Sequence, residues 1–200
     1  MHIRSLSLRQ FRTYHRLELD LPAAPVLLLG ANAQGKTSLL EAIAYLALGT
    51  SPLTSIDRHV IHWDAVEGDL PFAHVQAEIV RSGQTEKLEI AVEHKRLSNG
   101  HSRIQKSYRV DQRSVRRSEL AGHLNVVLFL PEDLDLVHGS PSGRRRYLDN
   151  LLSQVYPTYV DVYDAFRRAV SERNALLRHL RERGGDSTQL APLEERIVRA

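Results

Sequence analysis

The clearest chemical signal in the sequence lies between positions 30 and 37. This segment fits the phosphate-binding pattern G-x-x-x-x-G-K-[ST] and reads Gly30-Ala31-Asn32-Ala33-Gln34-Gly35-Lys36-Thr37. Gly30 lets the chain turn sharply, and Gly35 lets the backbone approach a phosphate because it has no Cβ. The N–H groups of such a loop form a nest for an anion at the amino end of a helix. Lys36 would then reach the β- and γ-phosphates of ATP, and the Thr37 hydroxyl would bind Mg²⁺.

A phosphate-binding loop of this kind needs a strand before it and a helix after it. Residues 25–30 form a short, continuously apolar run, which predicts a strand covered on both faces. Residues 36–48 carry apolar side chains at helical spacing, and Gly49 is suited to end that helix. The sequence therefore predicts strand, loop and helix over residues 25–49.

Further strands are predicted before and after this unit. Residues 5–9 and 17–21 alternate between apolar and polar side chains, although Ile3 is out of phase with the first run. Three strand-like runs then predict an antiparallel meander, with turns at 82–83 and 98–100; they cover residues 73–80, 87–93 and 106–110.

The last third of the chain is predicted to be mostly helical. Residues 125–130 are one more apolar strand, which Pro131 ends. Ser140 followed by Pro141 is typical of a helix start, and Pro157 begins a longer helix that reaches Arg183.

A nucleotide-hydrolysing site also needs a carboxylate that holds Mg²⁺ and polarises water. Glu132 and Asp133 follow an apolar strand, which fits that role, but Pro131 ends the strand before the acids arrive. In the alternative interpretation, Pro131 opens a helix and both acids lie in its first turn, and the true carboxylate lies beyond Ala200. We assign no catalytic residue from the sequence.

Other candidate residues have ordinary explanations. His59 and His62 are three residues apart, but no third metal ligand suggests itself nearby. Five aromatic side chains recur near helical spacing, and packing between helices is favoured over stacking on bases; they are Tyr147, Tyr156, Tyr159, Tyr163 and Phe166.

Composition excludes several classes of protein. The 200 residues include 42% hydrophobic and 26% charged side chains, which is typical of a folded globular chain. Apolar runs stay well below the ~20 residues that span a bilayer, and the amino end lacks the apolar core of a secretory signal. There is no Cys, which removes disulfides, thiol catalysis and Cys-ligated zinc, and is consistent with a reducing cytoplasm.

The net charge is +3, and the basic residues are concentrated in one stretch. Residues 103–117 hold six basic side chains against Asp111 alone: Arg103, Lys106, Arg109, Arg113, Arg116 and Arg117. Such a stretch suggests a polyanion such as DNA, and the alternative is a solvated surface. Arg144–Arg146 form a competing basic cluster.

Several segments together resemble the RecF family of bacterial recombination proteins, relatives of the SMC and Rad50 ATPase heads. Residues 11–14 resemble the family's F-R-N-Y, and residues 30–43 resemble its G-x-N-G-Q-G-K-T-x-L-L-E-A-I. Residues 129–149 resemble its F-x-P-E-D-L, V-x-G-S-P and R-R-R-x-L-D segments. Two departures are Ala33 in place of Gly, and Ser51-Pro52-Leu53 in place of Ser-His-Arg.

The resemblance implies an α/β fold, namely a P-loop NTPase of the ABC-ATPase-head type with an antiparallel β-meander and a helical lobe. It implies an ATP-binding lobe over residues 1–138 and the start of a helical lobe over residues 139–200. Arg12 is expected near the phosphates, Asn32 facing the nucleotide and Gln34 near the γ-phosphate. The family's signature and strand-Asp-Asp motifs do not occur in the sequence, so we expect the amino-terminal part of a longer protein.

For function, the resemblance implies a cytoplasmic, ATP-dependent DNA-binding protein of DNA-damage repair, replication restart and the SOS response. It implies DNA binding at gaps, an ATP-dependent homodimer, and RecO and RecR as partners. Slow, DNA-stimulated ATP hydrolysis is expected of the full-length dimer and not of these residues alone. Two alternatives are a metabolic P-loop kinase and an SMC-like structural head, although Pro157 and Gly184-Gly185 leave only a modest helix for the latter.

Overall fold

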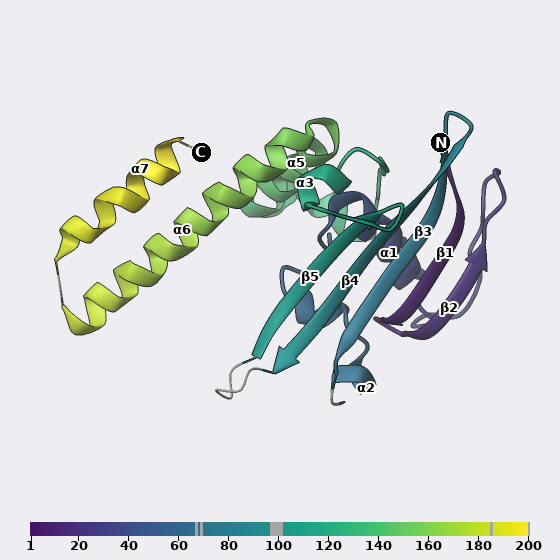
Figure 1. Ribbon diagram of the computed structural model, residues 1–200, viewed down its shortest axis with the longest axis horizontal. Coiled ribbons are helices and arrows are strands. Elements are labelled where there is room, and N and C mark those ends of the chain that lie inside the picture. Colours follow the sequence, from purple (N-terminus) through teal and green to yellow (C-terminus); the bar gives the residue numbers. More distant parts are fainter. Residues whose placement is uncertain (67, 69, 97–101, 185, 200) are drawn as a thin grey trace.

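The computed structural model describes the chain apart from residues 67, 69, 97–101, 185 and 200. Its largest element is a six-stranded antiparallel sheet with the strand order β2-β1-β3-β4-β5-β6 (Figure 1). The strands are β1 (His2–Phe11), β2 (Tyr14–Asp20), β3 (Phe72–Arg81), β4 (Gln84–Arg96), β5 (Ser102–Val110) and β6 (Arg113–Val115). The predicted meander is confirmed as β3, β4 and β5, while its predicted turn at 98–100 lies outside the described residues.

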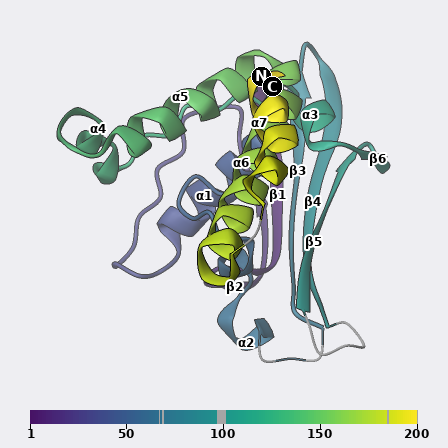
Figure 2. The ribbon, with the colours of Figure 1, turned by 90° about the vertical axis from the view of Figure 1, so that its left-hand side faces the viewer.

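Helices cover one face of this sheet and continue beyond its edge. Figure 2 shows the sheet nearly edge on, with α1 on one side of it. The α-helices are α1 (Lys36–Leu48), α2 (Trp63–Val66), α3 (Arg117–Leu120), α4 (Asp135–His138), α5 (Pro141–Val155), α6 (Pro157–Arg183) and α7 (Ala191–Arg199). Three short 3₁₀ helices complete the fold: η1 (Asp57–Val60), η2 (Pro131–Leu134) and η3 (Ser187–Leu190).

The core lies between α1 and the apolar face of the sheet. Alternate residues of β1, β3 and β4 point toward α1, as the period of two predicts. In return α1 contributes Leu39, Ala42, Tyr45 and Leu46, all buried. This packing fixes the amino end of α1, and with it the phosphate-binding loop, against the sheet.

The break in the apolar–polar alternation at Ile3 has a structural cause. Ile3 pairs with Ile79 and Leu6 pairs with Ala77, so an advance of three residues along β1 lies opposite an advance of two residues along β3. The extra residue is a β-bulge between Ile3 and Ser5. The bulge turns Ile3 to the same face as Leu6, where it packs against the core.

The strands predicted over residues 25–30 and 125–130 are wrong. Neither segment has regular secondary structure or belongs to the sheet of the described residues. Leu28 and Val126 pack against the core and Leu130 is buried, but alternate apolar side chains are exposed: 79% and 83% for Leu27 and Leu29, and 92% and 71% for Val127 and Phe129. An apolar run becomes a buried strand only where neighbouring strands bond to its backbone, and the six described strands pair with one another instead.

The helical predictions are confirmed. Ser140 caps α5 by accepting a hydrogen bond from the Gly143 N–H, and Pro141 is the first helical residue. Pro157 starts α6, which ends at Arg183. Figure 1 shows α5, α6 and α7 extending away from the sheet, and ion pairs such as Arg196–Glu172 join α7 to α6. A domain boundary between residues 138 and 139 stays a prediction.

Arg117 connects the end of α1 to this helical extension. Its Nε donates to the Leu48 carbonyl (2.9 Å) and its NH1 to the Asp164 carboxylate (2.7 Å). The Arg117 side chain is 11% exposed, so these contacts lie mostly away from water. The guanidinium therefore satisfies a carbonyl at the carboxyl end of α1 and an acid of α6 together.

We expect Arg117→Ala to lower the free energy of unfolding by about 1–3 kcal/mol, because it leaves the Leu48 carbonyl and Asp164 without their donor. Urea denaturation measures this. Arg116→Ala is the matched control: Arg116 is 72% exposed and, within the described part of the chain, its side chain pairs with Glu119 three positions on, so its loss should be much smaller. Equal effects of the two substitutions would contradict the connecting role of Arg117.

Candidate nucleotide-binding site

The phosphate-binding loop rests on the turn between β1 and β2. Gly35 has φ +91°, and a Cβ added there would lie 2.7 Å from Thr13 Oγ1 and 2.8 Å from the Tyr14 hydroxyl. The Tyr14 hydroxyl donates to the Gly35 carbonyl (3.2 Å), and burial raises the pKa of Tyr14. Gly35 is thus required twice, for its left-handed backbone and for the close approach of Tyr14.

Lys36 crosses the beginning of the loop. Its Nζ donates to the carbonyls of Gly30 (2.7 Å) and Ala31 (2.6 Å). The loop thereby surrounds the ammonium group, which is the one strong positive charge that the loop itself carries.

The amino end of α1 is suited to an anion. Its cap residue is Gly35, without a side-chain cap, and its first turn has no acidic residue. The Leu39 N–H bonds to the Gly35 carbonyl (2.9 Å), so the N–H groups before it lie ahead of the first helical hydrogen bond. Those groups and the helix dipole favour a phosphate, and Thr37 is exposed in the same turn.

Ala33 takes the backbone conformation that glycine favours. Its φ is +63°, in the left-handed region, which costs a residue with a Cβ about 1–2 kcal/mol. The neighbouring Asn32 and Gln34 are exposed. Ala33, which stands where the resemblance gives Gly, therefore adopts this conformation at an energetic cost.

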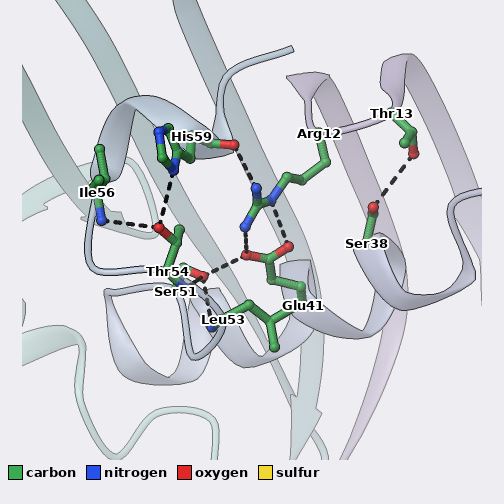
Figure 3. Close-up of polar contacts among 9 residues, drawn as sticks. All are labelled: Arg12, Thr13, Ser38, Glu41, Ser51, Leu53, Thr54, Ile56 and His59. Carbon is green, nitrogen blue, oxygen red and sulfur yellow. Dashed lines mark hydrogen bonds and ion pairs between the residues drawn. The ribbon is translucent and has the colours of Figure 1, made fainter. Parts of the chain in front are cut away.

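Arg12 pairs with Glu41 of α1, as Figure 3 shows. Its Nε donates to Glu41 Oε2 (2.7 Å), its NH2 to Oε1 (2.6 Å), and its NH1 to the His59 carbonyl (2.7 Å). Glu41 is 2% exposed, so this fork-to-fork pair neutralises a buried carboxylate. Arg12 thus holds α1 against the β1–β2 turn, and its expected place near the phosphates stays a prediction.

Ser51 belongs to the same cluster (Figure 3). Its hydroxyl donates to Glu41 Oε1 (2.5 Å) and accepts the N–H groups of Leu53 (3.0 Å) and Thr54 (3.1 Å). The segment that departs from the family's Ser-His-Arg thus keeps its serine, and that serine shapes the turn after α1.

Asp133 lies at the start of a helix, as one of the two interpretations predicts. Its Oδ2 accepts the Leu130 N–H (2.7 Å), and Pro131 is the first residue of η2. This carboxylate is used to close the turn at its own position. The sequence left both interpretations open, and the geometry favours the first turn of a helix.

The basic stretch of residues 103–117 is divided between two faces. Lys106 points toward η1 and pairs with Asp57 (2.9 Å), and Arg117 pairs with Asp164. Arg103 and Arg109 lie on the opposite face of β5, because residues of odd and even number alternate along a strand. The six residues therefore do not form one continuous surface.

The remaining candidates have structural partners. Tyr159 and Tyr163 stack on α6 with ring centroids 5.8 Å apart, and the Tyr159 hydroxyl donates to Asp149 of α5 (2.6 Å), which raises the pKa of Tyr159 to about 12. Of the five aromatic residues, Tyr159 contacts a second helix through its hydroxyl, whereas Tyr147, Tyr156 and Phe166 are exposed, so packing between helices stays a prediction for these three. His59 contacts Thr54 (3.4 Å), whereas His62 lies beside His15, far away in sequence.

The chain is similar to known proteins in both sequence and fold. The family of AAA domains matches residues 5–155. The DNA replication and repair protein RecF of Chloroflexus aurantiacus is 46% identical over 186 residues, which are 91% of this chain and 47% of that protein. The RecF of Roseiflexus castenholzii is 43% identical over 188 residues, 91% of this chain and 48% of that protein.

Two solved structures share the fold. One is described as the recombination mediator protein RecF with ATPrS in the RecFOR pathway, and it superposes with a TM-score of 0.75 at 26% identity. The other is RecF with ATP, with a TM-score of 0.74 at 26% identity. The alignments cover 98% of this chain and 50% and 49% of those chains.

The loop, the α1 helix and the fold together define a P-loop NTPase of α/β class, and the chain belongs to the AAA domain family. Within that family the chain is a RecF homologue. It spans about half the length of the curated relatives that it matches. Among the residues that the structure describes, no helix has the length and apolar character needed to cross a membrane.

The contribution of close packing at Gly35 to stability can be measured separately from the contribution of its left-handed backbone. Gly83 also has a left-handed backbone (φ +80°), but a Cβ added there would meet nothing within 4 Å. Gly83→Ala should lower the free energy of unfolding by about 1–2 kcal/mol through strain alone. Gly35→Ala should cost about 1–3 kcal/mol more, because the new methyl group displaces Tyr14. Equal losses in urea denaturation would show that the β1–β2 turn does not support the loop.

Proposed function

We propose that this chain is the nucleotide-binding part of an ATP-dependent DNA-binding protein that acts in DNA replication and recombinational repair. The observation that carries the proposal is the convergence of Lys36 with the free amino end of α1 on one loop. The names of the relatives, and solved RecF structures with ATP and ATPrS, support the same nucleotide.

In this proposal the loop holds the triphosphate of ATP, and each residue acts through its backbone N–H or side chain. The contributing residues are Gly30, Ala31, Asn32, Ala33, Gln34, Gly35, Lys36 and Thr37. Thr37 is the protein ligand for Mg²⁺, since its hydroxyl is exposed in the first turn of α1 and Mg²⁺ accepts one such oxygen beside phosphate oxygens and water. The same proposal divides the chain into an ATP-binding lobe (1–138) and a helical lobe that begins at residue 139.

Binding and hydrolysis are separate in this proposal. Hydrolysis needs a carboxylate that orients the attacking water, and the Asp133 carboxylate already accepts the Leu130 N–H. We therefore name no catalytic residue and expect weak ATP binding without turnover by these 200 residues. Slow, DNA-stimulated hydrolysis is expected of the full-length RecF-like protein.

DNA is the macromolecular ligand of the proposal, and the protein acts in the cytoplasm. RecO and RecR are the proposed partners, supported by the description of the solved relatives as members of the RecFOR pathway. ATP would promote a homodimer, because a second subunit can close over the γ-phosphate and complete the site. The metabolic-kinase and SMC-head alternatives lose support, since the similarity to RecF proteins covers 91% of the chain.

Lys36→Ala tests the nucleotide site. We expect ATP affinity to fall by about 10- to 150-fold, which corresponds to about 1.5–3 kcal/mol for a charge-assisted phosphate contact. Calorimetric titration with ATP and Mg²⁺ measures the affinity, and circular dichroism checks the fold. Lys95→Ala is the control, because Lys95 pairs with Glu93 on β4, away from the loop. Unchanged affinity in folded Lys36→Ala protein would overturn the site.

DNA binding is tested by its dependence on salt. Each phosphate contact adds about −0.9 to the slope of log affinity against log salt on duplex DNA. We expect a double change of Arg103 and Arg109 to Ala to reduce the size of that slope by about 2. The matched variant changes Arg145 and Arg146, both exposed on α5, and should leave the slope unchanged. The reverse result would place the DNA on α5.

A further inference from the structure

A cluster of three metal-ligating side chains lies outside the nucleotide-binding loop. His15 is near the start of β2, His62 lies between η1 and α2, and Asp64 is in α2. One ligand atom of each residue lies within 4.8 Å of the others. The His15 Nε2 is 3.3 Å from Asp64 Oδ2, and the His62 Nδ1 is 4.0 Å from the same oxygen.

The backbone holds these three residues together. The His62 N–H donates to the Gln10 carbonyl (2.7 Å), and Phe11 and Ile61 form a β-bridge, so the segment before α2 is bonded to the end of β1. His62 is 3% exposed, and its ring centroid lies 3.9 Å from that of His15. Only His15 and Asp64, each with a side chain 62% exposed, are free to adjust.

The spacing suits a small divalent transition metal. Ligand atoms of a tetrahedral zinc ion lie about 3.3–3.5 Å apart, because each lies about 2.0–2.2 Å from the metal. The His15–Asp64 separation of 3.3 Å already matches, and the two exposed side chains can close the rest. Two imidazoles and one carboxylate are ligands that Zn²⁺ and Co²⁺ accept together.

We propose that His15, His62 and Asp64 bind a zinc-like divalent transition metal ion, with water in the fourth position. The site uses no residue of the phosphate-binding loop. The three ligands belong to β2, the segment before α2, and α2 itself, so the ion joins these elements. The turn that contacts Gly35 immediately precedes His15, and the bound ion therefore stiffens the support of the loop.

Trp63 provides a fluorescence signal for metal binding, because it contacts His62. Its Nε1 lies 3.1 Å from His62 Nε2, and the Asp64 backbone nitrogen lies 3.2 Å from His62 Nδ1. A neutral imidazole carries one proton, so it accepts only one of these two N–H groups. A metal ion bound at Nδ1 leaves that proton on Nε2, where the indole N–H no longer finds an acceptor, so the surroundings of Trp63 change. Trp63 is 74% exposed, which leaves it room to turn, and it is the one tryptophan of the chain.

The test is a Co²⁺ titration of the tag-free, nucleotide-free protein. Visible absorption of the bound Co²⁺ and quenching of the Trp63 emission should saturate together at one ion per chain, and Zn²⁺ should displace the Co²⁺. His15→Ala and Asp64→Ala should each lower the affinity at least about 10-fold. Both side chains are largely exposed, so circular dichroism should show folded variants.

Two matched controls exclude adventitious binding. His59→Ala removes a neighbouring histidine that contacts Thr54 instead of the cluster. His2→Ala removes a chelate that His2 could form with the amino terminus. Both variants should bind Co²⁺ as the unchanged protein does. The proposal is overturned if the unchanged protein binds no Co²⁺, if His15→Ala and Asp64→Ala bind normally, or if a control variant loses binding equally.

Discussion

The architecture around the loop depends on one buried ion pair, between Arg12 and Glu41. Glu41 is 2% exposed on the face of α1 that meets the sheet, and a buried carboxylate left alone would cost about 3–5 kcal/mol. Arg12 supplies two parallel hydrogen bonds to it and a third to the His59 carbonyl. This pair joins the β1–β2 turn, α1 and η1 into one unit, so the turn helps to fix the position of the loop that precedes α1.

That unit contains strained backbone. Gln10 and Arg12 have φ of +51° and +53°, and Ala33 in the loop has +63°. Left-handed residues with a Cβ persist where surrounding contacts determine the backbone more strongly than its own preference does. Here the Arg12–Glu41 pair, the Tyr14–Gly35 contact and the Lys36 bonds to the loop carbonyls provide those contacts. The strain therefore lies in the β1–β2 turn and in the loop that precedes α1.

The β1–β2 hairpin therefore connects two sites of different chemistry. On one side its turn packs against Gly35 of the loop. On the other side His15 faces His62 and Asp64, a set of ligands that prefers a transition metal to the hard oxygen chemistry of Mg²⁺. A phosphate-binding loop gains from such rigid support, because its N–H groups act as an electrostatic cradle only while their directions are fixed.

The sequence by itself determined the features that depend on neighbours along the chain. The loop pattern, the α1 helix, the β3–β5 meander and the cap at Ser140 were all predictable, because local turn chemistry and side-chain periodicity specify them. Tertiary structure decided which groups meet across the fold. Arg12 pairs with Glu41, 29 positions away, and the His62 ring lies beside His15 instead of His59. Apolar composition over residues 25–30 predicted a buried strand, but pairing needs partner strands that no local pattern supplies. Likewise, the basic stretch is continuous in the sequence, but its side chains lie on different faces of the structure. Strand alternation and the acidic partners of Lys106 and Arg117 separate them, because the direction of a side chain is fixed only when its strand joins a sheet.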